Sequence, residues 1–167
     1  MKTIFYTFTL FPLKLAFLAW DIVFKLIPVR ILKFLGPFKI TKKNLSIAFP
    51  ELSDHELDLL AKESYKETLK SFYETLYAWS RSNKKIIYQT KKIKNRFLFN
   101  ASEQNKGLIV FALHNRSIDF MLRWISSQRS HTSLYKKIKL RPINNFVKKL
   151  REEENCKMVE TGIGGVK

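Results

Sequence analysis

The N-terminal part of the chain is its most hydrophobic stretch. Residues 4–29 contain five of the fourteen phenylalanines, and polar side chains interrupt this stretch at few positions. Four of these, Thr7, Lys14, Asp21 and Lys25, are spaced seven, seven and four residues apart, so they fall on one narrow stripe of a helix. Asp21 and Lys25 are also one turn apart, with the acid first, which favours an ion pair. The pattern predicts an apolar helix with a single polar stripe.

Three interpretations of this helix are open. A secretory signal would need an uninterrupted apolar run followed by small residues, which the sequence lacks. A core helix of a globular domain is possible, but a membrane-attached helix, either spanning or lying in the interface, is favoured. Basic residues follow it at Lys25, Arg30, Lys33, Lys39, Lys42 and Lys43, against Lys2 alone before it. This asymmetry predicts a membrane-anchoring segment over residues 1–40, with the bulk of the chain in the cytoplasm.

The next segment carries a strong helix-start signal. Residues 41–49 read as a short helix that ends at Pro50. Ser53 and Glu56 then form a capping box, which predicts a long helix ending near Ser80. Its apolar positions recur at helical spacing, which is more typical of a core stripe than of a ligand site. They are Leu57, Leu60, Ala61, Tyr65, Leu69, Phe72, Tyr73, Leu76 and Trp79.

In the C-terminal half, sequence patterns typical of strands alternate with patterns typical of helices. Strands are predicted at residues 86–93, 108–113, 132–136 and 157–160, and helices at residues 95–105, 117–128 and 142–154. The run at residues 108–113 is continuously apolar, as in a strand buried on both faces. The expected fold class is therefore α/β, in which a membrane-associated helical region precedes a partial, largely parallel sheet with helices on its faces.

Composition narrows the classes of function. The chain has 167 residues and a formal net charge of +17, which favours an anionic partner such as nucleic acid, a membrane surface or an acidic protein. A single cysteine, Cys156, excludes an internal disulfide, and with three histidines the sequence predicts no metal site.

One short motif has the composition of a catalytic site. His114 follows the predicted buried strand, and Asp119 comes five residues later in the first turn of the next helix. A carboxylate that fixes one imidazole nitrogen leaves the other as a general base, suited to deprotonating a substrate hydroxyl. In open parallel sheets such chemistry gathers beyond the carboxyl ends of the strands, where His114 is expected. His55 and His131 lack an acid at this spacing, and they read as a helix-cap residue and as a surface or loop residue, respectively.

The sequence resembles the late acyltransferases of lipid A biosynthesis, the lauroyl and myristoyl transferases that carry an H-x4-D/E motif. The resemblance rests on Asn-Leu-Ser-Ile-Ala-Phe-Pro-Glu-Leu-Ser at residues 44–53, Asn-Lys-Gly-Leu-Ile-Val at residues 105–110, and the motif at residues 114–119. Leu-Tyr-Lys at residues 134–136 and the helix that bears Arg151 add to it. Residues 41–167 then correspond to the N-terminal part of an acyltransferase domain.

The resemblance implies a reaction and its partners. A fatty acyl chain would pass from acyl carrier protein to a hydroxyl of a phosphorylated lipid A precursor at the cytoplasmic face of the bacterial inner membrane. His114 would be the base and Asp119 its partner, and Arg151 would bind a substrate phosphate or the oxyanion. Arg116, inside the motif, is a second candidate for a phosphate contact. The open alternative for each arginine is a solvated position at the surface, and no cofactor beyond the acyl donor is implied. Two groups of basic residues are candidates for docking the acidic partners. They are Lys84, Lys85, Lys91, Lys92, Lys94 and Arg96, and Lys136, Lys137, Lys139 and Arg141.

Two further expectations concern the length of the chain relative to this family and the other functions that its sequence allows. Members of this family are longer, so the chain resembles a C-terminally truncated member, for which weak activity is expected. A non-catalytic basic membrane-surface protein, a decayed remnant, is the main alternative. A nucleic-acid-binding module is less favoured, because the basic residues are scattered and the apolar N-terminal segment has no use in one.

Overall fold

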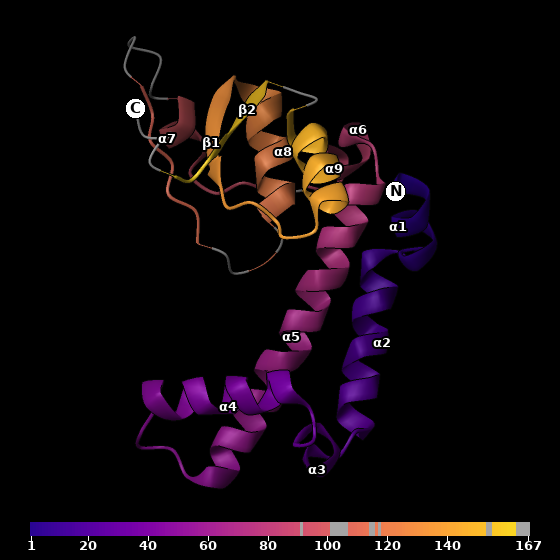
Figure 1. Ribbon diagram of the computed structural model, residues 1–167, viewed down its shortest axis with the longest axis vertical. Coiled ribbons are helices and arrows are strands. Elements are labelled where there is room, and N and C mark those ends of the chain that lie inside the picture. The colour runs from indigo at the N-terminus through magenta and orange to yellow at the C-terminus, as the bar shows by residue number, and fades with distance from the viewer. Residues whose placement is uncertain (91, 101–106, 114–115, 117, 153–154, 163–167) are drawn as a thin grey trace. The chain divides into compact units, whose positions relative to one another are not determined.

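A computed structural model describes residues 1–90, 92–100, 107–113, 116, 118–152 and 155–162. The chain divides into two compact units, residues 7–77 and residues 1–6 with 78–167. Figure 1 labels the helices and strands.

The unit of residues 7–77 is helical. Helix α2 (Leu13–Leu26), the short α3 (Val29–Leu32), α4 (Gly36–Ala48) and most of α5 (Asp54–Ser80) belong to it. Prolines mark the helix starts, with Pro12 and Pro28 immediately before α2 and α3 and Pro37 in the first turn of α4.

The single apolar helix expected over residues 4–29 is wrong. The chain forms α1 (Lys2–Phe8) and then a separate α2, because Pro12 lacks an N–H and disfavours a helical conformation at the residue before it. The expected pair of Asp21 and Lys25 is also replaced, since the Oδ1 atom of Asp21 lies 2.5 Å from Lys70 Nζ and 3.3 Å from Lys66 Nζ on α5. None of the described helices is by itself long and apolar enough to cross a bilayer, although α1 and α2 taken together as a bent pair meet that test.

The core of this unit joins α2, α3, α4 and α5. Phe24, Leu32, Phe38 and Ala61 are buried together, and Tyr65 packs its ring against both phenylalanines. The capping box at the start of α5 is confirmed, since Glu56 N donates to Ser53 Oγ and Ser53 N donates to a Glu56 carboxylate oxygen at 2.8 Å. The expected core stripe is correct for Leu57, Ala61 and Tyr65, whereas Phe72 is exposed.

The second unit contains α6 (Asn83–Gln89), α7 (Arg96–Asn100), α8 (Ile118–Gln128), β1 (His131–Tyr135), α9 (Arg141–Glu152) and β2 (Cys156–Glu160). Two strand predictions are wrong. Residues 86–93 were expected to form a strand, but α6 begins at Asn83, after Ser82, and buries Ile86 instead. The described residues 107–113 belong to no helix or strand, and Ile109, Phe111 and Leu113 are each at least 87% exposed.

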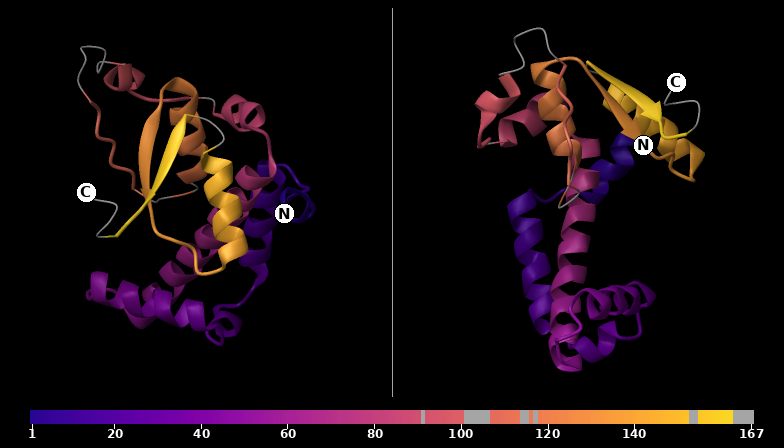
Figure 2. Two further views of the ribbon diagram at one scale, coloured as in Figure 1. Left: turned by 45° about the horizontal axis from the view of Figure 1, so that its top comes forward. Right: turned by 90° about the vertical axis from the view of Figure 1, so that its left-hand side faces the viewer.

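The prediction of parallel strands is confirmed for one pair, β1 and β2. In the described part of the chain, β1 and β2 pair in parallel, with His131 opposite Cys156 and Tyr135 opposite Glu160. The connection runs through α9, which packs against β2, so β1, α9 and β2 form one βαβ unit (Figures 1 and 2). Tyr135, Cys156 and Met158 form the sheet's buried cluster. His131, expected at the surface or in a loop, is half-buried in β1.

Candidate active site

Asp119 lies in the first turn of α8 and is 3% exposed. An acid in the first turn of a helix is favoured by the helix dipole. A fully enclosed carboxylate nevertheless needs compensating hydrogen bonds, because it has lost its contact with water. The partner that supplies them defines the site.

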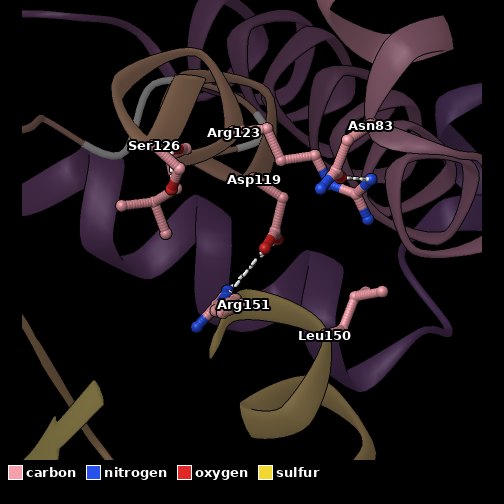
Figure 3. A pocket seen from close by; sticks show the side chains of 7 residues that line it. Asn83, Asp119, Arg123, Ser126, Leu150 and Arg151 are labelled. Carbon is pink, nitrogen blue, oxygen red and sulfur yellow. Dashed lines mark hydrogen bonds and ion pairs between the residues drawn. The ribbon is translucent and has the colours of Figure 1, made fainter. Parts of the chain in front are cut away.

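That partner is Arg151, in the last turn of α9. Its Nε atom donates to Asp119 Oδ1 at 2.8 Å and its Nη2 atom to Oδ2 at 3.2 Å (Figure 3). This forked pairing matches the planar guanidinium to both carboxylate oxygens. The side chain of Arg151 is 18% exposed, so the ion pair is largely screened from solvent. Two residues that the sequence singled out separately, 32 positions apart, are therefore one structural feature.

A second arginine lies one helical turn after Asp119. Arg123 is buried, and its Nη1 atom donates to the backbone carbonyl of Arg81 at 3.1 Å and to Asn83 Oδ1 (Figure 3). These contacts attach α8 to the first residue of α6 and to Arg81, the residue that follows α5. Arg123 therefore fixes the helix whose first turn carries Asp119.

The space between these side chains is small. Asn83, Asp119, Arg123, Ser126, Leu150 and Arg151 are among the residues that line a cavity of about 10 Å³, roughly the room that one water needs. The described side chains thus form a packed support for Asp119 rather than a substrate groove.

The other two predicted site residues are His114 and Arg116. His114 lies outside the described residues, so the expected dyad with Asp119 stays a prediction. Arg116 is described and exposed. Asp119 and Arg151 are the two predicted site residues that the structure places in contact.

Sequence reasoning missed Arg123 and Asn83. A signal for Arg123 existed, because it lies four residues after Asp119 on the same face of the same helix. Asn83 carried no such signal, since its contact with Arg123 spans 40 positions.

In the described part of the chain, no three His, Cys, Asp or Glu side chains converge as a metal site would require.

The comparison with known sequences decides the family. Residues 11–164 match the family described as "Bacterial lipid A biosynthesis acyltransferase", which covers most of the chain. The chain belongs to this family. The resemblance noted from its motifs is therefore confirmed.

A curated relative agrees with this assignment. The chain is 22% identical over 98 residues to the protein named "Lipid A biosynthesis lauroyltransferase" from Escherichia coli (strain K12). The aligned segment is 59% of this chain and 32% of the relative. The chain thus matches about a third of the length of that curated relative.

Proposed function

We propose that this member of the family transfers a fatty acyl chain from acyl carrier protein to a hydroxyl of a lipid A precursor. The observation that carries the proposal is the buried Asp119 carboxylate, which Arg151 holds in a forked ion pair five residues after His114. Two hydrogen bonds from one guanidinium hold a carboxylate in a fixed position, as a partner of a catalytic imidazole must be held.

In the proposed reaction His114 is the general base. It accepts the proton of the lipid hydroxyl as the hydroxyl oxygen attacks the thioester carbonyl carbon of the donor. A carbon–oxygen bond forms, the carbon–sulfur bond breaks, and the proton passes from the imidazolium to the departing thiolate. The products are the acylated lipid and free acyl carrier protein.

Asp119 and Arg151 have distinct proposed roles. Asp119 accepts a hydrogen bond from the other nitrogen of His114, which sets the tautomer and stabilises the imidazolium. Arg151 holds Asp119 with two of its five N–H donors, and we propose that the others bind the developing oxyanion or a substrate phosphate. Arg116, exposed near the start of α8, is a second candidate for a phosphate contact.

The proposed partners match the charge of the chain. Acyl carrier protein and phosphorylated lipid precursors are anionic, and a net charge of +17 favours their encounter. The proposed location is the cytoplasmic face of the bacterial inner membrane. The proposed mechanism uses the acyl thioester as donor and needs no further cofactor.

The test measures acyl transfer from radiolabelled acyl carrier protein to a lipid A precursor by membranes that contain the 167-residue chain. Transfer above the level of membranes without the chain is expected. His114→Ala should reduce it by roughly a hundredfold or more, the usual contribution of a general base. His55→Ala is the matched control, because His55 lies at the exposed start of α5 in the other unit. Transfer that is equal in the His114→Ala variant and the unsubstituted chain would contradict the proposal.

A further inference from the structure

A second site lies wholly within the unit of residues 7–77, on α4 and the segments that flank it. It is a groove of about 420 Å³ lined by both basic and apolar side chains. The lining residues are Lys33, Phe38, Lys39, Lys42, Lys43, Ser46, Asp54 and Leu57. Four lysines therefore surround one concave surface, and no step of the proposed acyl transfer uses them.

Two of the four lysines are structural. Lys33 Nζ lies 2.5 Å from Asp58 Oδ2, and Lys42 Nζ lies 2.6 Å from Asp58 Oδ1 and 2.7 Å from Asp54 Oδ1. Burial lowers the pKa of Lys42, but its hydrogen bonds to the two aspartates outweigh this effect and leave the pKa above its ordinary value. These ion pairs engage Asp54, the one acid among the lining residues, and the neighbouring Asp58.

Lys39 and Lys43 supply the excess charge. Both are exposed, and among the described residues neither lies in an ion pair. They are four residues apart on α4, so their ammonium groups project from neighbouring turns of one helix face. The groove therefore carries a net positive charge that the described residues do not neutralise.

An apolar stripe runs beside these lysines. Ile40 and Ile47 lie roughly 40° to 100° around α4 from Lys39 and Lys43, since each residue turns the helix by about 100°. Ile40 is 63% and Ile47 73% exposed, and Phe34, just before α4, is 80% exposed. Phe38, which lines the groove, is buried against Tyr65 and does not belong to this exposed stripe. Basic and apolar side chains thus form adjacent stripes on the outer surface of α4.

We propose that this groove binds the phosphate headgroup of an anionic phospholipid, with Ile40, Ile47 and Phe34 inserted at the bilayer interface. Adjacent apolar and lysine stripes are the composition of a helix that lies in the membrane plane. The charge of Lys39 and Lys43 complements a headgroup phosphate. An acidic folded protein would satisfy the lysines but would not account for the two strongly exposed isoleucines beside them, or for the exposed Phe34 that precedes α4. The proposal is independent of the acyl-transfer mechanism.

The experiment measures flotation of the full chain with two kinds of vesicle. One kind is phosphatidylcholine alone, and the other contains phosphatidylcholine and phosphatidylglycerol in equal amounts. The K39Q/K43Q variant should bind the anionic vesicles roughly thirtyfold more weakly than the unsubstituted chain, since each lysine near an anionic surface contributes about 1 kcal/mol. Its binding to phosphatidylcholine should not change. Both lysines are exposed, so the helical circular dichroism should be retained.

Two further variants make the test specific. K149Q/K157Q removes the same charge from exposed positions of the other unit and should bind anionic vesicles nearly as the unsubstituted chain does. Ile47→Ser should weaken binding to both kinds of vesicle, because it removes an inserted apolar side chain. Equal losses in K39Q/K43Q and K149Q/K157Q would overturn the proposal, since total charge alone would then explain binding. Failure of the unsubstituted chain to float, or binding of acyl carrier protein by Lys39 and Lys43 in place of vesicles, would overturn it as well.

Discussion

Arg151 binds Asp119 through two parallel hydrogen bonds, from Nε to Oδ1 at 2.8 Å and from Nη2 to Oδ2 at 3.2 Å. The contact joins the last turn of α9 to the first turn of α8. Asp119 is enclosed, so the ion pair sets the position of a carboxylate that has little access to water. Any role of Asp119 beside His114 therefore depends on Arg151.

Removing the arginine should destabilise the fold. Arg151→Met leaves the enclosed Asp119 carboxylate without its cation, and the free energy of unfolding should fall by about 3 kcal/mol, as when a buried ion pair loses one partner. Arg151→Lys keeps the charge but loses the two parallel hydrogen bonds of the guanidinium, so it should lower the free energy of unfolding by less than Arg151→Met does. Urea unfolding followed by circular dichroism measures both.

A double-variant cycle separates this pairing from simple loss of packing. Asp119→Asn combined with Arg151→Met removes both charges, so its cost should be smaller than the sum of the single costs by at least about 1 kcal/mol. Strictly additive costs would show that the two side chains do not stabilise one another.

Arg123 should prove to be a positioning residue. Arg123→Met removes the hydrogen bonds to the Arg81 carbonyl and to Asn83, and it should lower the free energy of unfolding by about 2 kcal/mol. In the acyl-transfer assay kcat should fall, because the first turn of α8 loses its attachment. Arg123→Lys should restore part of the stability. An Arg123→Met variant with unchanged stability would contradict the importance of these contacts.

Asp58 should make the unit of residues 7–77 sensitive to acid. Burial raises the pKa of Asp58, but hydrogen bonds from Lys33 and Lys42 outweigh it and hold the pKa below its ordinary 3.8. A carboxylate with a lowered pKa in the folded state stabilises the fold above its unfolded pKa, and this contribution disappears as the pH falls through the folded pKa.

The measurement compares urea midpoints at neutral pH and at a pH below that ordinary pKa. The unsubstituted chain should lose more stability across this range than Asp58→Asn, which has no carboxylate to protonate at that position. An identical pH dependence in the two proteins would show that the Asp58 ion pairs contribute nothing.

The apolar residues 108–113 give a further prediction. Ile109 is 87% and Phe111 97% exposed, so both should bind a hydrophobic dye and promote association. The I109S/F111S variant should bind less 8-anilinonaphthalene-1-sulfonate and remain monomeric at higher concentration, with little change in unfolding midpoint. Unchanged dye binding would place the accessible apolar surface elsewhere, for example on Phe34 and Ile47.

Patterns among residues close in sequence correctly predicted several helices and strands. The capping box at Ser53 located the start of α5, and the alternation after residue 117 located α8, β1, α9 and β2 in the correct order. These features depend on contacts a few residues apart, which the sequence displays directly.

Long-range contacts explain what the sequence did not reveal. Residues 108–113 have the composition of a buried strand, but burial requires neighbouring strands, and in the described part of the chain the sheet comprises β1 and β2. The apolar run of residues 86–93 was similarly ambiguous, because Ile86 is buried equally well from one face of a short helix. The ion pair of Asp119 and Arg151 joins residues 32 positions apart, so no pattern among neighbouring residues predicts it.

The most direct test of the account is the mass spectrum of lipid A from a bacterial strain that lacks its own late acyltransferase and expresses this chain. The account predicts lipid A with one additional acyl chain, and it predicts that this species disappears with His114→Ala and with Asp119→Ala while both variants accumulate in the membrane fraction. An additional acyl chain that persists in either variant would contradict the catalytic role of that residue. Lipid A that stays unmodified even with the unsubstituted chain would contradict the proposed acyl transfer itself.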